Sequence, residues 1–223
     1  MNATPASPAP AEGLDAWITP GRTAVLVIDM QVDFGSPQGA LGKAGVDMSI
    51  VTPALAAAER VVEAARAAGA PVIFVGLQTA PSTDSSAWRE WMRRRRGDPD
   101  GDSALCRAGT PGAAFMGPLP QAGEPVIAKT RYSGFHGAEL DGVLKGLGVD
   151  TLVVCGLTTE CCVDCTVRDA FHLDYHVFVV RDACAAYDPA LHEAALMSLE
   201  LNCAILADTS EIVSAWTGAD VDG

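Results

Sequence analysis

The chain has 223 residues, of which 49% are hydrophobic, and a formal net charge of −13. This length and composition predict one domain with a substantial core, and the acidic charge argues against nucleic acids and anionic membranes as partners. Seven cysteines at irregular spacing indicate reduced thiols in a cytoplasmic protein rather than a disulfide scaffold. No uninterrupted apolar run is long enough to cross a bilayer, so no membrane span is expected.

Both ends of the chain are predicted to lie outside the folded domain. Residues 1–20 are rich in Ala and Pro and lack the basic and apolar segments of a signal peptide, so they are interpreted as a flexible tail. The domain is expected to cover residues 21–216, followed by a second short tail at 217–223.

Short apolar segments and longer amphipathic segments alternate along this domain. The short ones are rich in β-branched residues, as expected of strands buried on both faces, and the longer ones are polar on one face, as expected of helices. In chain order the predicted elements are strand 24–28, helix 53–68, strand 71–75, strand 125–128, helix 138–147, strand 151–155, helix 162–172, strand 176–180, helix 189–201 and strand 203–206. The alternation predicts an α/β fold with three layers, in which a Rossmann-like, six-stranded parallel sheet lies between helices.

Residues 78–115 interrupt this alternation. The segment is rich in Gly, Pro, Asp and Ser and shows little periodicity, so we expect an insertion that roofs a pocket. A short helical stretch within it holds Trp88, Trp91 and the consecutive arginines at 93–96. In so acidic a chain this stretch is interpreted as a solvated helix face or a subunit contact, not as a nucleic-acid site.

Three reactive side chains follow predicted strands. Asp29 follows the strand at 24–28, Lys129 follows the strand at 125–128, and Cys162 ends the segment that follows the strand at 151–155. Taken alone, Asp29 could instead cap a helix or turn, and Lys129 could be an exposed lysine at the end of a strand. Because the carboxyl ends of parallel strands meet at one edge of a sheet, we expect the three to converge as base, electrostatic partner and nucleophile.

Cys162 is predicted to lie near the N-terminus of a helix, where unpaired N–H groups lower the pKa of a thiol and hold an oxyanion. Its alternatives are an inert core thiol, a redox pair with Cys165, and a metal site that includes Cys161 and Cys165. Cys162 and Cys165 are three residues apart within the first turns of a helix, without an intervening Pro or Gly as in redox motifs. The sequence also contains no second cluster of Cys or His residues that would complete a zinc site. We therefore expect no metal and no cofactor.

Four ordered motifs resemble those of the isochorismatase-like cysteine hydrolases, a superfamily that includes nicotinamidase, N-carbamoylsarcosine amidohydrolase, ureidoacrylate amidohydrolase and biuret hydrolase. The motifs are DMQVDF at 29–34, GTPGA at 109–113, KTRYSGF at 129–135 and GLTTECCV at 156–163. The resemblance spans about residues 23–212 and implies the isochorismatase-like hydrolase fold.

By this resemblance Asp29, Lys129 and Cys162 are a catalytic triad, the peptide bond between Leu157 and Thr158 is cis, and the N–H groups of Thr158 and Cys162 form the oxyanion hole. True isochorismatases lack the cysteine, so its presence favours amide hydrolysis through a thioester. The segment at 78–82 lacks the Asp and His residues of metal-binding nicotinamidases, which again implies no metal.

The expected substrate is a small amide, ureido or carbamoyl compound, with a larger or cyclic amide of the lactam-antibiotic type as an alternative. The expected contacts are aromatic walls and polar groups near the triad: Phe34, Gln78, Arg131, Tyr132, Phe135 and Thr159. The rival classes are a nitrilase, which the DMQVDF motif argues against, a thiol redox protein that uses Cys162 and Cys165, and a non-catalytic interaction module, which does not explain an intact triad. As relatives form them, a homodimer or homotetramer is expected.

Overall fold

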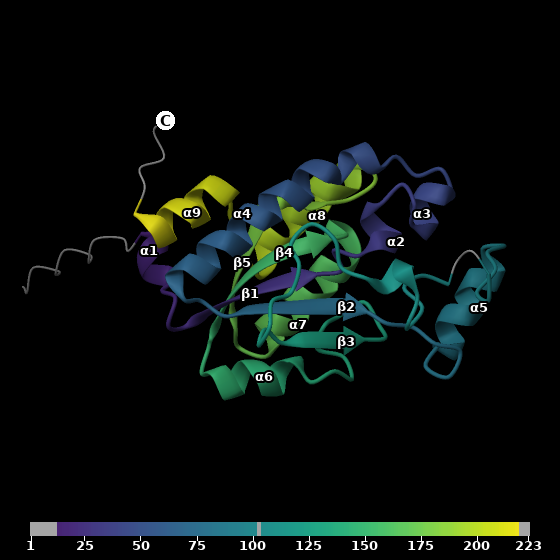
Figure 1. Ribbon diagram of the computed structural model, residues 1–223, viewed down its shortest axis with the longest axis horizontal. Helices are drawn as coiled ribbons and strands as arrows, with labels where there is room; N and C mark the ends of the chain where they lie inside the picture. Colours follow the sequence, from purple (N-terminus) through teal and green to yellow (C-terminus); the bar gives the residue numbers. More distant parts are fainter. Residues whose placement is uncertain (1–12, 102–103, 219–223) are drawn as a thin grey trace, which may run out of the picture.

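Six parallel strands form a sheet at the centre of the molecule, in the order β3-β2-β1-β4-β5-β6 (Figure 1). The computed structural model describes residues 13–101 and 104–218. The strands are β1 (Thr23–Ile28), β2 (Val72–Leu77), β3 (Val126–Lys129), β4 (Thr151–Leu157), β5 (His176–Ala185) and β6 (Ile205–Ala207). The predicted three-layer fold with a six-stranded parallel sheet is confirmed.

The two central strands, β1 and β4, are buried at every position. Helices cover both faces of the sheet, so neither face of these strands meets water. This is why their sequences are continuous apolar runs rather than alternations of apolar and polar residues. The core therefore lies in two layers, one on each side of β1 and β4.

Helices cover the two faces of the sheet in separate groups. On one face α1, α4 and α9 pack over a core that includes Val25 and Val153, and on the other face α6, α7 and α8 pack over a core that includes Leu26 and Val154. Figure 1 shows α5 near the end to which the strand arrows point, and α1 toward the opposite end. The helices are α1 (Leu14–Trp17), α2 (Val32–Gly35), α3 (Ala40–Lys43), α4 (Thr52–Ala68), α5 (Ser86–Arg94), α6 (Leu140–Leu147), α7 (Asp164–His172), α8 (Pro189–Asn202) and α9 (Thr209–Thr217), with short helical turns η1 (Met48–Ile50), η2 (Pro111–Ala113) and η3 (Thr159–Val163).

The predicted N-terminal tail is too long by several residues. Residues 1–12 lie outside the described residues, but Ile18 is fully buried and its carbonyl accepts a hydrogen bond from Trp216 Nε1 at 2.7 Å. The folded part therefore begins before residue 20, because an apolar side chain in this segment joins the core. At the other end α9 ends at Thr217, and residues 219–223 lie outside the described residues.

The strand order reverses between β1 and β4, since β2 and β3 lie on one side of this pair and β5 and β6 on the other. In parallel α/β sheets such a switch point leaves a crevice at the carboxyl ends of the strands. Gly156 lies here with φ +148°, and a Cβ atom at this position would be 2.2 Å from the carbonyl oxygen of Ile28. Only glycine allows β4 to approach β1 this closely. The contact lies at the carboxyl ends of the two strands, next to the residues that follow them.

Candidate active site

Asp29 is the first residue after β1, and its side chain is completely buried. Its backbone has φ 47°, in the left-handed region that few residues other than Gly, Asn and Asp adopt. Oδ1 accepts a hydrogen bond from the Leu77 N–H at 2.9 Å, and Oδ2 lies 2.7 Å from Nζ of Lys129. Its charge is therefore balanced by a neighbouring cation rather than by water.

Lys129 is the last residue of β3, and its side chain is also fully buried. Its ammonium donates a hydrogen bond to the carbonyl oxygen of Arg131 at 3.0 Å and contacts both Asp29 and the sulfur of Cys162. Burial lowers the pKa of Lys129, but Asp29 and Cys162 outweigh that effect, so the pKa lies above its ordinary value. Lys129 is thus a buried cation held between two acidic groups.

Cys162 lies in η3, a π-helical turn that joins β4 to α7. Its carbonyl oxygen accepts a hydrogen bond from Thr166 Oγ1 at 2.7 Å, and that hydroxyl oxygen accepts one from the Gly134 N–H at 3.0 Å. The two bonds fasten the turn that carries Cys162 to the loop that follows Lys129. The ends of β1, β3 and β4 thereby bring the three predicted residues together, with Lys129 between the other two.

The prediction that the helix N-terminus acidifies Cys162 is wrong. A hydrogen bond with Cys161, burial and the Asp29 carboxylate raise the pKa of the Cys162 thiol well above its ordinary value, and Lys129 offsets them only in part. The same hydrogen bond is the main reason why the pKa of Cys161 is lowered. A nucleophilic sulfur at Cys162 therefore requires a base that removes the thiol proton.

Thr158 separates β4 from the cysteine turn, Thr159 is the first residue of that turn, and both are buried. The peptide bond between Leu157 and Thr158 is cis, as the resemblance implies. In the part of the chain that the structure describes, the Thr158 N–H donates to no backbone or side-chain acceptor, which leaves it available to a bound oxygen atom. The Thr159 hydroxyl is hydrogen-bonded to Nδ1 of His192 at 2.8 Å, so it holds α8 against the turn.

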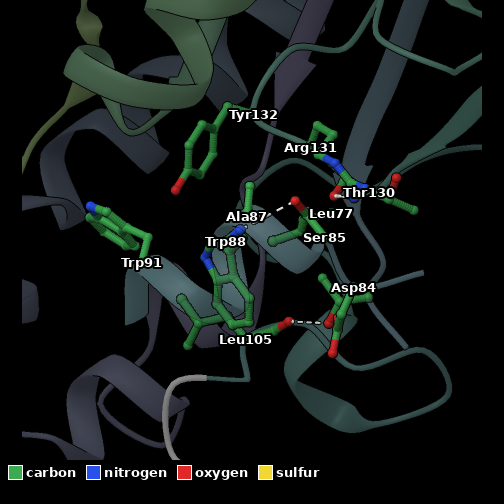
Figure 2. A pocket seen from close by; sticks show the side chains of 11 residues that line it. Leu77, Asp84, Ser85, Ala87, Trp88, Trp91, Leu105, Thr130, Arg131 and Tyr132 are labelled. Atoms are coloured by element: carbon green, nitrogen blue, oxygen red, sulfur yellow. Dashed lines mark hydrogen bonds between the residues drawn. The ribbon is translucent and has the colours of Figure 1, made fainter. Parts of the chain in front are cut away.

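A cavity of about 540 Å³ adjoins this site, and we call it the aromatic cavity. Figure 2 shows Trp88, Trp91 and Tyr132 on one side of it and Thr130 and Arg131 on the other. Its lining residues come from β2, the segment around α5 and the loop after β3: Leu77, Thr79, Asp84, Ser85, Ala87, Trp88, Trp91, Leu105, Thr130, Arg131 and Tyr132. The insertion predicted to roof a pocket therefore does supply walls of one.

Only two of the predicted substrate contacts, Arg131 and Tyr132, line the aromatic cavity. Phe34 lies in the core, and its carbonyl oxygen accepts a hydrogen bond from the Tyr187 hydroxyl at 2.7 Å. The ring of Phe135 packs on Tyr175, with centroids 5.9 Å apart, and Gln78 is exposed at the end of β2. Phe34, Phe135 and Gln78 do lie just after the strands, as the sequence indicates. The direction of each side chain, however, depends on packing against residues that are distant in the sequence.

Two polar residues of the first motif hold the loops around the site. Nε2 of Gln31 donates to the carbonyl oxygens of Leu77 at 2.9 Å and Ala113 at 2.7 Å. Asp33 accepts from the N–H of Ala40 at 2.9 Å and from that of Cys106 at 2.7 Å. The motif DMQVDF thus supplies one candidate base and two residues that fix the insertion. Only the polarity of Gln31 and Asp33 directly after a buried strand signals this role in the sequence.

The state of the cysteines bears on whether Cys162 belongs to a redox pair or to a metal site. All seven cysteines are free thiols, and burial is the main cause that raises the pKa of Cys165 above its ordinary value. Among the described residues no group of three or more His, Cys, Asp or Glu side chains is arranged to hold a metal ion. No helix within residues 13–101 and 104–218 combines the length and apolar character that crossing a bilayer demands.

The chain matches one family model and is similar to several known proteins. The family model described as the isochorismatase domain matches residues 23–211. The chain is 35% identical to a protein named ureidoacrylate amidohydrolase RutB from Methylobacterium radiotolerans, over 96% of this chain and 90% of that protein. Among solved structures it resembles a cysteine hydrolase from Pseudomonas syringae pv. phaseolicola, with a TM-score of 0.79, 29% identity and coverage of 91% of this chain and 96% of that one. It also resembles N-carbamoylsarcosine amidase from Thermoplasma acidophilum, with a TM-score of 0.68, 29% identity and coverage of 84% and 96%.

Proposed function

Since the chain belongs to the isochorismatase family, we propose that it is a cysteine amidohydrolase that cleaves a ureido or carbamoyl compound through a thioester intermediate. It is a hydrolase of C–N bonds other than peptide bonds, in keeping with relatives named ureidoacrylate amidohydrolase and N-carbamoylsarcosine amidase. The observation that carries the proposed mechanism is one buried lysine in contact with both a buried carboxylate and a buried thiol. This arrangement provides a base, a nucleophile and a fixed cation in one water-poor site.

In the first half of the reaction the Cys162 sulfur attacks the carbonyl carbon. Asp29 takes the thiol proton, the new C–S bond forms, and the carbonyl oxygen becomes an oxyanion. The N–H groups of Thr158 and Cys162 stabilise this oxygen, and Lys129 balances the negative charge that passes between Asp29 and the sulfur. Asp29 then gives the proton to the leaving nitrogen, the C–N bond breaks, and a thioester remains on Cys162.

The second half reverses the roles around a water molecule. Asp29 removes a proton from water, the water oxygen attacks the thioester carbon, and a second oxyanion forms in the same place. The C–S bond breaks and the sulfur recovers a proton from Asp29. The products are an amine and an acid, and the enzyme returns to its first state. The raised pKa of Cys162 agrees with this cycle, since the sulfur begins and ends as a thiol.

We further propose that the enzyme is cytoplasmic and forms a homo-oligomer. Free thiols at all seven cysteines are in keeping with the expected reducing, cytoplasmic location. Large exposed apolar side chains on α8, among them Met197 at 69% and Leu201 at 82% exposure, are in keeping with a homodimer or homotetramer.

The direct test measures ammonia release from a panel of ureidoacrylate, biuret, N-carbamoyl amino acids and nicotinamide. We expect wild-type enzyme to hydrolyse at least one ureido or carbamoyl compound, and chelator treatment to leave the rate unchanged. Cys162→Ala removes the nucleophile and is expected to lower kcat at least about 1,000-fold.

Cys165→Ala is the matched control because Cys165 is the neighbouring cysteine in α7 and is half-buried. It is expected to keep wild-type activity within about twofold. Full activity in Cys162→Ala would overturn the mechanism. Equal losses in the two variants would favour a thiol pair over a single nucleophile.

A further inference from the structure

The aromatic cavity adjoins the triad through four of its lining residues. Leu77 donates its N–H to Oδ1 of Asp29 at 2.9 Å, and Thr130 directly follows Lys129. The carbonyl oxygen of Arg131 accepts a hydrogen bond from Lys129 Nζ at 3.0 Å. Burial raises the pKa of the Tyr132 phenol, and the neighbouring Cys161 and Cys162 raise it further, so Tyr132 lies near both cysteines. A ligand attached to a carbonyl group at Cys162 therefore has this cavity beside it.

The cavity is larger than a ureido group needs. Its volume of about 540 Å³ falls within the range of about 300–1,000 Å³ that drug-sized ligands occupy. Trp88, Trp91 and Tyr132 supply flat surfaces, and Leu105 adds an aliphatic one (Figure 2). A small polar substrate would leave this apolar surface wet, whereas a flat apolar group would cover it.

Most polar groups of the cavity already have partners within the protein. The Thr79 hydroxyl donates to the Leu105 carbonyl oxygen at 2.7 Å, and Ser85 Oγ accepts from the Trp88 backbone N–H at 3.2 Å. Asp84 accepts from Arg107 at 2.7 Å, and Arg131 donates to the Thr130 carbonyl oxygen at 2.7 Å. These partners satisfy Thr79, Ser85 and Asp84. Among the described residues, however, the Arg131 guanidinium donates only from Nη1, to carbonyl oxygens, and pairs with no carboxylate.

Further hydrogen-bond donors remain open on the aromatic side of the cavity. In the part of the chain described by the structure, no hydrogen bond involves the Tyr132 hydroxyl or the indole N–H of Trp88 or Trp91. Arg95 lies 4.7 Å from the centre of the Trp91 ring, a cation–π contact that steadies this side chain. The walls thus combine aromatic faces with a few N–H and O–H donors, which suits a flat ring beside a hydrogen-bond acceptor.

We propose that the natural substrate is a ureido or carbamoyl compound that carries an aromatic ring, and that the aromatic cavity binds this ring while the scissile carbonyl group lies at Cys162. This proposal rests on the proposed function for the position of the carbonyl group. Trp88, Trp91 and Tyr132 are then specificity-determining residues that distinguish an aromatic substrate from its aliphatic analogue.

The test compares N-carbamoyl-phenylalanine with N-carbamoyl-alanine, which differ only by a phenyl ring. Calorimetric titration of Cys162→Ala protein measures binding without turnover. We expect the phenylalanine compound to bind at least about tenfold more tightly, because burying one aromatic ring is worth about a factor of ten or more. Adding Trp91→Ala is expected to bring the ratio of the two dissociation constants close to one.

Trp17→Ala is the matched control, because Trp17 is 44% exposed, as against 45% for Trp91, and lines a different cavity. It is expected to leave the ratio unchanged, and Trp88→Leu provides a second variant within the aromatic cavity.

Equal binding of the two compounds, or equal effects of Trp91→Ala and Trp17→Ala, would overturn the proposal. Cysteine-dependent hydrolysis of small ureides without any preference for the ring would reject the aromatic substrate and leave the proposed function standing. Preference for the ring in binding, without hydrolysis of any compound, would support the cavity and reject the mechanism.

Discussion

At the scale of single residues, the Asp29–Lys129 pair is the most demanding feature of the site. Two charged side chains with no exposed surface lie 2.7 Å apart. Removing both from water costs several kcal/mol per ion, and their attraction together with the surrounding hydrogen bonds offsets that cost. Loss of one partner leaves the other charge buried without compensation.

Lys129→Met tests this pair. The variant keeps an unbranched side chain but leaves the Asp29 carboxylate uncompensated, so we expect a loss of about 3–5 kcal/mol in the free energy of unfolding together with a loss of activity. Denaturant unfolding followed by circular dichroism measures the change. Lys145→Met removes an exposed lysine paired with Asp141 on α6 and should cost no more than about 0.5 kcal/mol. Similar effects of the two substitutions would contradict a buried, mutually dependent pair.

The sequence predicts which residues meet at the site better than it predicts their pKa values or the directions of their side chains. Asp29, Lys129 and Cys162 stand at strand ends, so the parallel topology alone brings them together. The raised pKa of Cys162 depends on the neighbouring Cys161 thiol and on burial, and neither follows from the spacing of residues in the sequence. The directions of Phe34 and Phe135 likewise depend on neighbours that are distant in sequence.

At the scale of elements, the ten strands and helices expected from the sequence are all present, with bounds that differ by a few residues at most sites. The largest difference is β5, which continues to Ala185 although Arg181 and Asp182 end the apolar run at residue 180. A register shift opposite Val154 and Gly156 keeps it paired with β4 beyond these charges. Short α2 and α3 escape prediction because four-residue helices lack a measurable period.

An ion pair joins α4 to the loop before β3, and its contribution to stability can be tested. Arg66 binds Glu124 through two hydrogen bonds of 2.8 Å each, and Glu124 also accepts from the Gln121 N–H at 2.7 Å. Glu124→Gln should lower the free energy of unfolding by about 1 kcal/mol at pH 7, because hydrogen bonds to a charged group are among the stronger ones. Glu90→Gln, in the exposed pair with Arg94, should change it by less than about 0.5 kcal/mol.

The same comparison has a defined pH dependence. The hydrogen bond with Arg66 holds the pKa of Glu124 below its ordinary value in the folded protein. Its ionised form therefore stabilises the fold above the ordinary glutamate pKa of about 4.3, and this contribution is lost as the pH falls through the lower pKa of the folded state. The difference between wild type and Glu124→Gln should be present at pH 7 and absent below that lower pKa. A difference that stays constant with pH would mean that packing, rather than charge, is responsible.

At the scale of the whole molecule, the fold places its reactive groups at one end of the sheet and leaves other apolar surface exposed. Leu201 at 82% and Met197 at 69% exposure lie on α8, a helix that contributes no residue to the lining of the aromatic cavity. Light scattering after size-exclusion chromatography should give the mass of a homodimer or homotetramer at micromolar concentration. A monomer at every concentration tested would refute the expected assembly while leaving the triad unaffected.

A covalent intermediate on Cys162 is expected during turnover, and acid quenching while a ureido or carbamoyl compound is being cleaved would trap it. Tandem mass spectrometry of the quenched protein locates any added acyl group among Cys161, Cys162 and Cys165. We expect an adduct on Cys162 with the mass of the acyl part of the substrate, and none on Cys161 or Cys165. An adduct on Cys161, or undiminished turnover in Cys162→Ala, would contradict it.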